Sequence, residues 1–146
     1  MKTISRYALF TLSLLSTTLF AANQPNIVNQ DSLKWQPANG LKGAEVAVIS
    51  GNPEKKGPFI ARVKLPANFE IPVHMHHINE YDTILSGAIY LGTGKTADLN
   101  NTKEIPAGSF VMIPAKLQHY AFTKEETILQ INGMGPWGMV YKPHHA

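Results

Sequence analysis

The fold of this chain is constrained most strongly by a series of short apolar runs separated by turn residues. Beyond residue 44, apolar and polar side chains alternate within the runs, and Gly, Pro and Asn stand between them. Alternation with a period of two is typical of a strand with one buried face. The runs recur about every eight to twelve residues and no helical periodicity follows residue 22, so the sequence predicts an all-β sandwich or barrel.

Two of these runs also contain candidate binding residues. Arg62 and Gln130 are polar residues within otherwise apolar runs, and we consider both as substrate contacts. The sequence leaves open which face of its strand each one occupies. The predicted strands are residues 45–50, 58–65, 81–85, 88–91, 109–113, 119–123, 127–131 and 139–141, together with the strand that carries His74 and His76.

Residues 1–22 have the three parts of a secretory signal peptide. These parts are the basic Lys2 and Arg6, the apolar stretch Tyr7–Phe20, and the small residues Ala21 and Ala22. The stretch is short and rich in Ser and Thr for a membrane span, although an uncleaved anchor is the alternative. We therefore expect an exported protein, periplasmic or extracellular, with no stable membrane span once the signal is removed.

The remaining chain has the length of one domain. Removal of 22 of the 146 residues leaves 124, which is enough for one core and too short for two. Residues 23–43 are predicted to be an irregular leader because they are rich in Asn, Gln and Pro. Residues 44–143 then form the barrel domain, and residues 144–146 form a C-terminal tail.

Charge and cysteine content exclude several kinds of function. Loss of Lys2 and Arg6 leaves 11 of the 13 basic residues against 10 acidic ones, a net charge of +1, so charge provides no argument for nucleic acid as a partner. The chain has no cysteine. Disulfides, thiolate metal ligands and thiol nucleophiles are therefore excluded.

Residue types that bind metals gather in the segment 72–87. His74 and His76 are two residues apart, so their imidazoles lie on one face of a strand and can converge. Glu80 follows after a gap that fits a tight turn. Two imidazoles and one carboxylate suit a divalent transition metal. His77 is adjacent to His76 and is expected on the opposite face.

A second segment supplies a fourth ligand type, because an apolar run bounded by Gly108 and Pro114 leads to His119. Together the two segments resemble the paired motifs of the cupin superfamily. The first motif is matched by His74, His76, Glu80 and Gly87, and the second by Gly108, Pro114 and His119.

Three positions depart from the cupin pattern. Asn68 stands where the first motif opens with Gly, Lys116 replaces a Gly of the second, and Thr123 replaces its final Asn. None of the three is a ligand position, so the ligand set is intact. Lys116 must accept whatever backbone angles the Gly would have had.

The resemblance implies a double-stranded β-helix, which is a jelly-roll barrel with a metal inside. It also implies His74, His76, Glu80 and His119 as the ligands, which leaves two open positions on a metal that prefers six. Two functions are then open. One is a metal-dependent dioxygenase, isomerase or lyase acting on a small oxygenated molecule, and the other is a non-catalytic cupin that binds or senses a metal or ligand.

The chemistry of the barrel interior would narrow the substrate class. Walls that are apolar beyond the ligands would favour an aromatic or lipid-derived molecule, whereas walls with Arg, Gln and Asp would favour an organic acid. Asp82 is the candidate catalytic residue, because strand alternation places it on the same side as Glu80. There it could act as a general base or orient a ligand histidine. The alternative is a bulge that exposes it.

The choice of metal depends on where the site is filled. The signal segment lacks a twin-arginine pair, so export of an unfolded chain is expected and the metal must bind after the membrane is crossed. Among first-row divalent ions, affinity rises towards copper and stays high for zinc. Zinc or copper is therefore favoured, although the ligand set also suits manganese, iron or nickel.

A homodimer is expected because similar cupins commonly pair through outer sheet faces. The segment Met134–Tyr141 is also strongly apolar for a chain end. Its Trp137 and Met139 either cover the barrel or face a partner.

Overall fold

The structure is a computed structural model that describes residues 24–141. The predicted signal peptide and the C-terminal tail lie outside these residues. Within the described part of the chain, no helix has the length and apolar content needed to cross a membrane.

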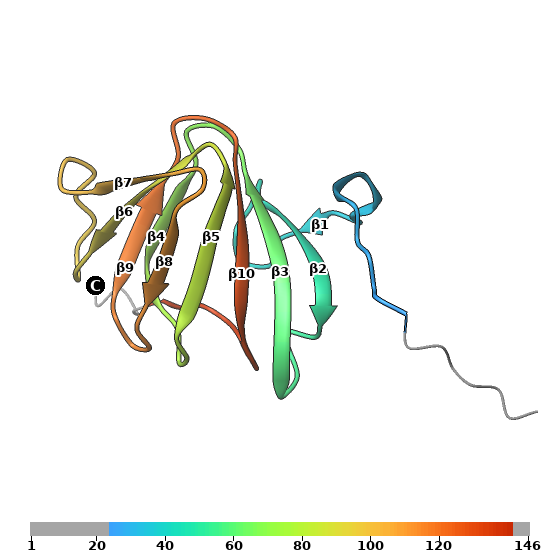
Figure 1. Cartoon of the computed structure of the whole chain (residues 1–146). Helices are drawn as coiled ribbons and strands as arrows, with labels where there is room; N and C mark the ends of the chain where they lie inside the picture. Colours follow the sequence, from blue (N-terminus) through green and yellow to red (C-terminus); the bar gives the residue numbers. More distant parts are fainter. Residues whose placement is uncertain (1–23, 142–146) are drawn as a thin grey trace, which may run out of the picture.

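Two antiparallel sheets face each other and enclose the core (Figure 1). One sheet has six strands in the spatial order β1 (Gln36–Pro37), β2 (Glu45–Gly51), β3 (Gly57–Leu65), β10 (Thr127–Gly135), β5 (Glu80–Ser86) and β8 (Phe110–Ile113). The other has five, in the order β11 (Val140–Tyr141), β4 (Glu70–Met75), β9 (His119–Phe122), β6 (Ala88–Thr93) and β7 (Lys103–Pro106). A short 3-10 turn, η1 (Gln30–Ser32), precedes β1.

The strand order confirms the predicted all-β jelly roll, since most spatial neighbours are distant in sequence. β10, for example, lies between β3 and β5, and β9 lies between β4 and β6. This arrangement brings the strand that ends near His76 beside the strand that begins at His119. The topology therefore places the two sequence motifs on adjacent strands.

The strands β3 and β10 lie side by side at the centre of the six-stranded sheet. The two strands pair over nine residues, from Thr127 opposite Leu65 to Gly135 opposite Gly57. Alternate residues of each strand are buried, as a two-residue period requires. Burial of one such aliphatic side chain stabilises the fold by about 1.5–3 kcal/mol. The buried residues of these strands are Phe59, Ala61, Val63, Leu65, Thr127, Leu129 and Ile131.

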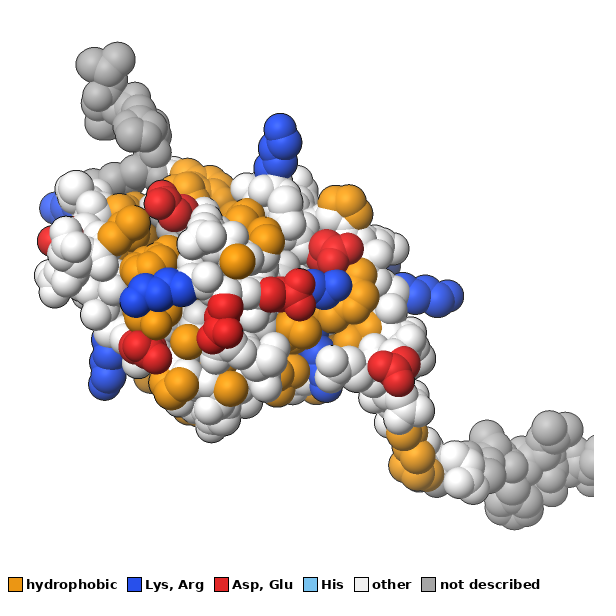
Figure 2. All heavy atoms as spheres, turned by 90° about the horizontal axis from the view of Figure 1, so that it is seen from above, with side chains coloured by type: hydrophobic (Ala, Val, Ile, Leu, Met, Phe, Trp, Pro, Cys, Tyr) orange, Lys and Arg blue, Asp and Glu red, His pale blue; other side chains and the backbone are white. Residues whose placement is uncertain are grey.

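The outer surface carries charges of both signs. Figure 2 shows Lys and Arg interspersed with Asp and Glu on one face, with apolar side chains between them. This mixture agrees with the small net charge calculated without residues 1–22.

The turns that depart from the cupin pattern keep the geometry of a glycine. Lys116 has φ +66° and Asn68 has φ +56°, so both occupy the left-handed region as expected for positions that otherwise hold Gly. The backbone N–H of Lys116 donates a 2.8 Å hydrogen bond to the carbonyl of His76. The turn of the second motif is thereby fixed against the end of the histidine strand.

Thr123 replaces the last residue of the second motif and is almost fully buried. Its hydroxyl donates a 2.7 Å hydrogen bond to the carbonyl of Pro66 and accepts one of 3.1 Å from the N–H of Phe69. A single side chain therefore ties the end of β9 to the turn that leads into β4.

Candidate metal centre

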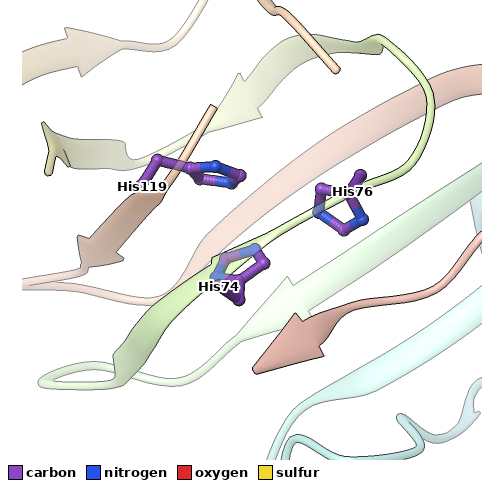
Figure 3. A group of neighbouring side chains, drawn as sticks. All are labelled: His74, His76 and His119. Carbon is purple, nitrogen blue, oxygen red and sulfur yellow. The ribbon is translucent and has the colours of Figure 1, made fainter. Parts of the chain in front are cut away.

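Three histidines from neighbouring strands converge in the barrel. His74 lies in β4, His76 follows directly after it, and His119 begins β9, where it is paired in register with His74. Figure 3 shows the three rings gathered around one point. Each residue is at most 5% exposed.

The hydrogen bonds of the three rings leave one nitrogen free on each. A carbonyl can only accept a hydrogen bond, so every Nδ1 that contacts one carries the proton and the lone pair is on Nε2. The candidate ligand atoms of the three rings lie within 4.8 Å of one another. The Nδ1 contacts are His74 to Pro72 O at 2.8 Å, His76 to Gly138 O at 2.9 Å and His119 to Leu117 O at 3.0 Å.

Glu80 brings a carboxylate to this cluster from the opposite sheet. Its Oε2 lies 3.2 Å from Nε2 of His76 and 3.7 Å from Nε2 of His119, and the residue is buried. The neutral ring of His76 has no proton on Nε2, so this buried nitrogen has no hydrogen-bond partner. A cation among these atoms would satisfy the buried nitrogen lone pairs and the carboxylate at once. The residues present therefore fit a bound divalent metal.

The surroundings favour the neutral form of two of the rings. Burial, followed by the neighbouring His119, lowers the pKa of His74 from 6.5 to about 4. Burial also lowers the pKa of His119. At His76 burial acts in the same direction, but the hydrogen bond that a protonated ring would make to Glu80, and the charge of Glu80, outweigh it and raise the pKa above 6.5. Protons therefore compete with a metal mainly at His76.

This competition predicts a pH-dependent metal affinity. As the pH falls from 7.5 to 5.5, His76 gains a proton that the metal must displace, so the Kd for zinc should rise by about tenfold per pH unit below the pKa of His76. Calorimetric titration at several pH values measures the slope. An affinity that stays constant over this range would show that these imidazoles do not bind the metal.

A cavity of about 60 Å³ lies between the sheets beside the histidines. Its walls are aliphatic side chains from both sheets, with Trp137 and Met139 from the C-terminal segment. Among residues 24–141, Asp82 is the only polar residue that lines it beyond the three histidines and Glu80. The interior is therefore of the apolar kind that favours an aromatic or lipid-derived molecule.

Asp82 faces the interior, as alternation along β5 predicts. Glu80, Asp82 and Ile84 are all buried on the same face of this strand. Burial, followed by the charge of Glu80, raises the pKa of Asp82 well above its usual value, and Oδ1 has no hydrogen-bond partner. The structure thus places a carboxyl group with an unused oxygen in the cavity, and its catalytic role stays a prediction.

Arg62 and Gln130 are not brought to this cavity. They lie opposite each other in β3 and β10, on the face that alternates with the buried residues. The guanidinium Nε of Arg62 donates a 3.2 Å hydrogen bond to the side-chain oxygen of Gln130. Alternation directs both side chains to the outer face of the sheet, away from the histidines, and their role as substrate contacts stays a prediction.

The C-terminal segment covers the barrel at the histidines. The indole of Trp137 stacks on the ring of His76 with centroids 4.9 Å apart and an angle of 11° between the planes. Gly138 supplies the carbonyl that holds Nδ1 of His76. Of the two alternatives for Trp137 and Met139, the structure supports the first, since both line the cavity. The exposed His77 lies away from it, as expected.

Comparison with solved structures places this geometry among known folds. The polyketide cyclase RemF from Streptomyces resistomycificus superposes with a TM-score of 0.66 at 17% identity, covering 83% of this chain and 89% of that one. A putative acetylacetone dioxygenase from Methylibium petroleiphilum PM1 superposes with a TM-score of 0.64 at 17% identity, covering 84% of this chain and 85% of that one. An RmlC-like cupin from Shewanella frigidimarina NCIMB 400 gives 0.59 at 15% identity, with coverages of 76% and 91%. At these identities the likeness shows the fold.

The two-sheet barrel, with both motifs meeting at its buried histidines, is that of a cupin. Residues 26–146 match the family model "Domain of unknown function (DUF4437)". The chain therefore belongs to this family. A search of curated proteins finds no significant match.

Proposed function

We propose that this protein is a metal-dependent enzyme acting on a small, mostly apolar molecule that carries oxygen atoms. The observation that carries the proposal is the cluster of three imidazole Nε2 atoms beside Glu80, at the edge of a cavity with apolar walls. The polyketide cyclase and the putative acetylacetone dioxygenase support it, because their names indicate substrates that combine carbonyl oxygens with a carbon skeleton.

The proposed ligands are His74, His76, Glu80 and His119. A metal bound there would act as a Lewis acid on a substrate oxygen. The carbonyls that accept from the three Nδ1–H groups fix the orientation and the tautomer of the rings before the metal binds. The apolar walls exclude bulk water and hold the carbon skeleton of the substrate.

Asp82 is proposed to exchange a proton with the substrate. Its raised pKa favours a protonated carboxyl group, which could donate to a substrate oxygen and take a proton back. Asp82→Asn keeps the shape of the side chain and removes this ability. We expect turnover to fall by about 100-fold or more, the usual contribution of general acid–base catalysis, while zinc affinity changes only a few-fold.

The assay for Asp82→Asn uses metal-loaded protein and acetylacetone together with larger 1,3-dicarbonyl compounds, and it follows loss of their ultraviolet absorption. Wild-type turnover of at least one compound, with none of small dicarboxylic acids, would support the substrate class. Full turnover by the variant would reject the role of Asp82. Metal and ligand binding without any turnover would instead establish the non-catalytic binding or sensing cupin.

The native metal is proposed to be zinc or copper, because we also propose export and filling of the site in the periplasm or outside the cell. Elemental analysis of protein purified from its own exported fraction, without chelators or affinity metals, should find one of the two near one equivalent. Near-stoichiometric manganese or iron would show that the order of metal affinities does not determine which metal occupies the site. It would also favour redox or oxygen chemistry.

The homodimer also remains a proposal. Trp137 and Met139 line the cavity and are partly buried, so their apolar character alone is no argument for a contact between two copies. Sedimentation of the purified protein at high micromolar concentration tests the proposal, and a single monomer species would reject it.

A further inference from the structure

Three buried side-chain atoms within residues 24–141 have no hydrogen-bond partner. They are Nε2 of His76, Oδ1 of Asp82 and Nε1 of Trp137. All three residues line the same cavity. A buried polar atom without a partner costs about 1–3 kcal/mol, so such atoms mark where a metal, a water or a ligand belongs.

A metal would not account for all three of these atoms. It would take the lone pair of His76 Nε2, as proposed above. An indole N–H can only donate a hydrogen bond, and a cation offers it no acceptor. The N–H of Trp137 would therefore still lack a partner in the metal-loaded protein, and whatever occupies the rest of the cavity must provide an acceptor.

Trp137 is held so that its indole cannot turn away easily. Its backbone N–H donates a 2.7 Å hydrogen bond to the carbonyl of Pro53. One side of the indole stacks on His76, and the ring of Phe59 packs with its centroid 5.9 Å away. An orientation imposed from both the backbone and the ring is typical of a group that is positioned before a ligand binds.

A phenyl ring at this position could make the same stacking contact on His76. What the indole adds is the buried donor. In a cavity whose walls are aliphatic away from the histidines, Glu80 and Asp82, one further donor on the opposite segment discriminates between ligands with and without an acceptor there, because a ligand without one leaves the donor unpaired.

We propose that the Trp137 indole N–H determines substrate specificity by donating a hydrogen bond to a carbonyl or similar acceptor oxygen of the substrate. The substrate is then an apolar molecule with an acceptor oxygen directed at Trp137, and a hydrocarbon of the same shape is rejected. This inference rests on the proposed function and refines its substrate class.

The test uses the two tryptophans of the chain as separate reporters. In nitrogen-15 spectra of the purified, zinc-loaded protein, Trp35→Phe assigns the remaining indole signal to Trp137. Cyclopentanone, a small ketone, should move the Trp137 signal downfield and slow its exchange with water. Cyclopentane should do neither. The Trp35 signal should stay unchanged, since Trp35 packs under the Lys64 ammonium outside the cavity.

Trp137→Phe removes the donor while keeping an aromatic ring against His76. Loss of one neutral hydrogen bond should weaken cyclopentanone binding about three- to tenfold, whereas cyclopentane should bind no more weakly than to the wild type, because the variant has no donor for it to leave unpaired. Met139→Leu is the matched control on the same segment, because it alters the cavity wall and neither adds nor removes a hydrogen-bond donor. It should change the affinity for both probes equally.

Three results would overturn the inference. These are no shift of the Trp137 signal with cyclopentanone, an equal loss of affinity for both probes in Trp137→Phe, and no binding of either probe at saturation. The same titrations on metal-free protein separate this inference from the proposed function. Failure to bind zinc, or zinc binding without turnover, would reject the proposed metal-dependent enzyme. A shift of the Trp137 signal with cyclopentanone but not with cyclopentane would then still support the proposed hydrogen bond.

Discussion

Replacement of His119 by alanine is expected to abolish stoichiometric metal binding. The substitution removes one of three converging Nε2 atoms and leaves two imidazoles and Glu80. Loss of a group that merely orients a ligand lowers metal affinity about 10–100-fold, so loss of a ligand should lower it by at least about 100-fold. Calorimetric titration of metal-free protein with zinc measures the change.

His77→Ala is the matched control, because it removes an exposed imidazole one residue from the site. Its zinc affinity should equal that of the wild type. Circular dichroism and thermal melting of the metal-free variants establish that each is folded. One equivalent of zinc bound to folded His119→Ala with unchanged affinity would place the metal elsewhere.

Gly87→Ala is expected to lower the free energy of unfolding by about 2–5 kcal/mol. Gly87 has φ +69°, where an L side chain is strained by about 1–2 kcal/mol. The added Cβ would also lie 2.5 Å from the hydroxyl of Thr127 and 2.6 Å from the carbonyl of Glu126. Overpacking of this kind adds about 1–3 kcal/mol. Urea unfolding of the metal-free protein measures the loss.

Gly108→Ala separates the two contributions to this loss. Gly108 also has a left-handed backbone, at φ +83°, but nothing lies within 4 Å of an added Cβ. Its substitution should therefore show the backbone strain alone. If Gly87→Ala were no more destabilising than Gly108→Ala, the close approach between the turn at Gly87 and the start of β10 would contribute nothing to the loss of stability.

Most strands could be predicted because their alternation is visible in the sequence. β3 shows the buried and exposed faces residue by residue, and its predicted extent, 58–65, differs from the observed Gly57–Leu65 by one residue. β7 was not predicted, because Lys103–Pro106 contains a single buried residue, Ile105, and a proline. It is an edge strand defined by its pairing with β6, and pairing leaves no local signal.

The end of β10 was also not predicted. The apolar run stops at Ile131, whereas the strand continues to Gly135. Asn132–Gly135 have no alternating pattern of their own, and they are extended because they pair with the first residues of β3. Long-range pairing therefore extends a strand beyond the reach of its own sequence.

The cluster of histidines could be anticipated because spacing along strands determines which side chains share a face. That argument brings His74 and His76 together, and it also places Asp82 with Glu80. It did not place Arg62, although alternation with Val63 in the same run indicated the outer face. A comparison of the two faces of that run would have placed Arg62 on the outer face of the sheet, away from the barrel interior.

The contribution of the C-terminal segment could not be predicted in detail. Gly138 holds His76 through its carbonyl, and the two residues are 62 positions apart. A backbone carbonyl has no residue type by which to recognise it. The apolar composition of Met134–Tyr141 indicated a buried segment or an interface, and only the three-dimensional arrangement shows that Trp137 lies against the histidines.

X-ray absorption spectroscopy of the wild-type protein loaded with one equivalent of zinc tests the central claim most directly. Three imidazole nitrogens at about 2.0–2.1 Å, with the scattering pattern of intact rings, and at least one oxygen are expected around the metal. A shell made only of oxygen, or one with a single imidazole, would contradict the assignment of His74, His76 and His119 as the metal site.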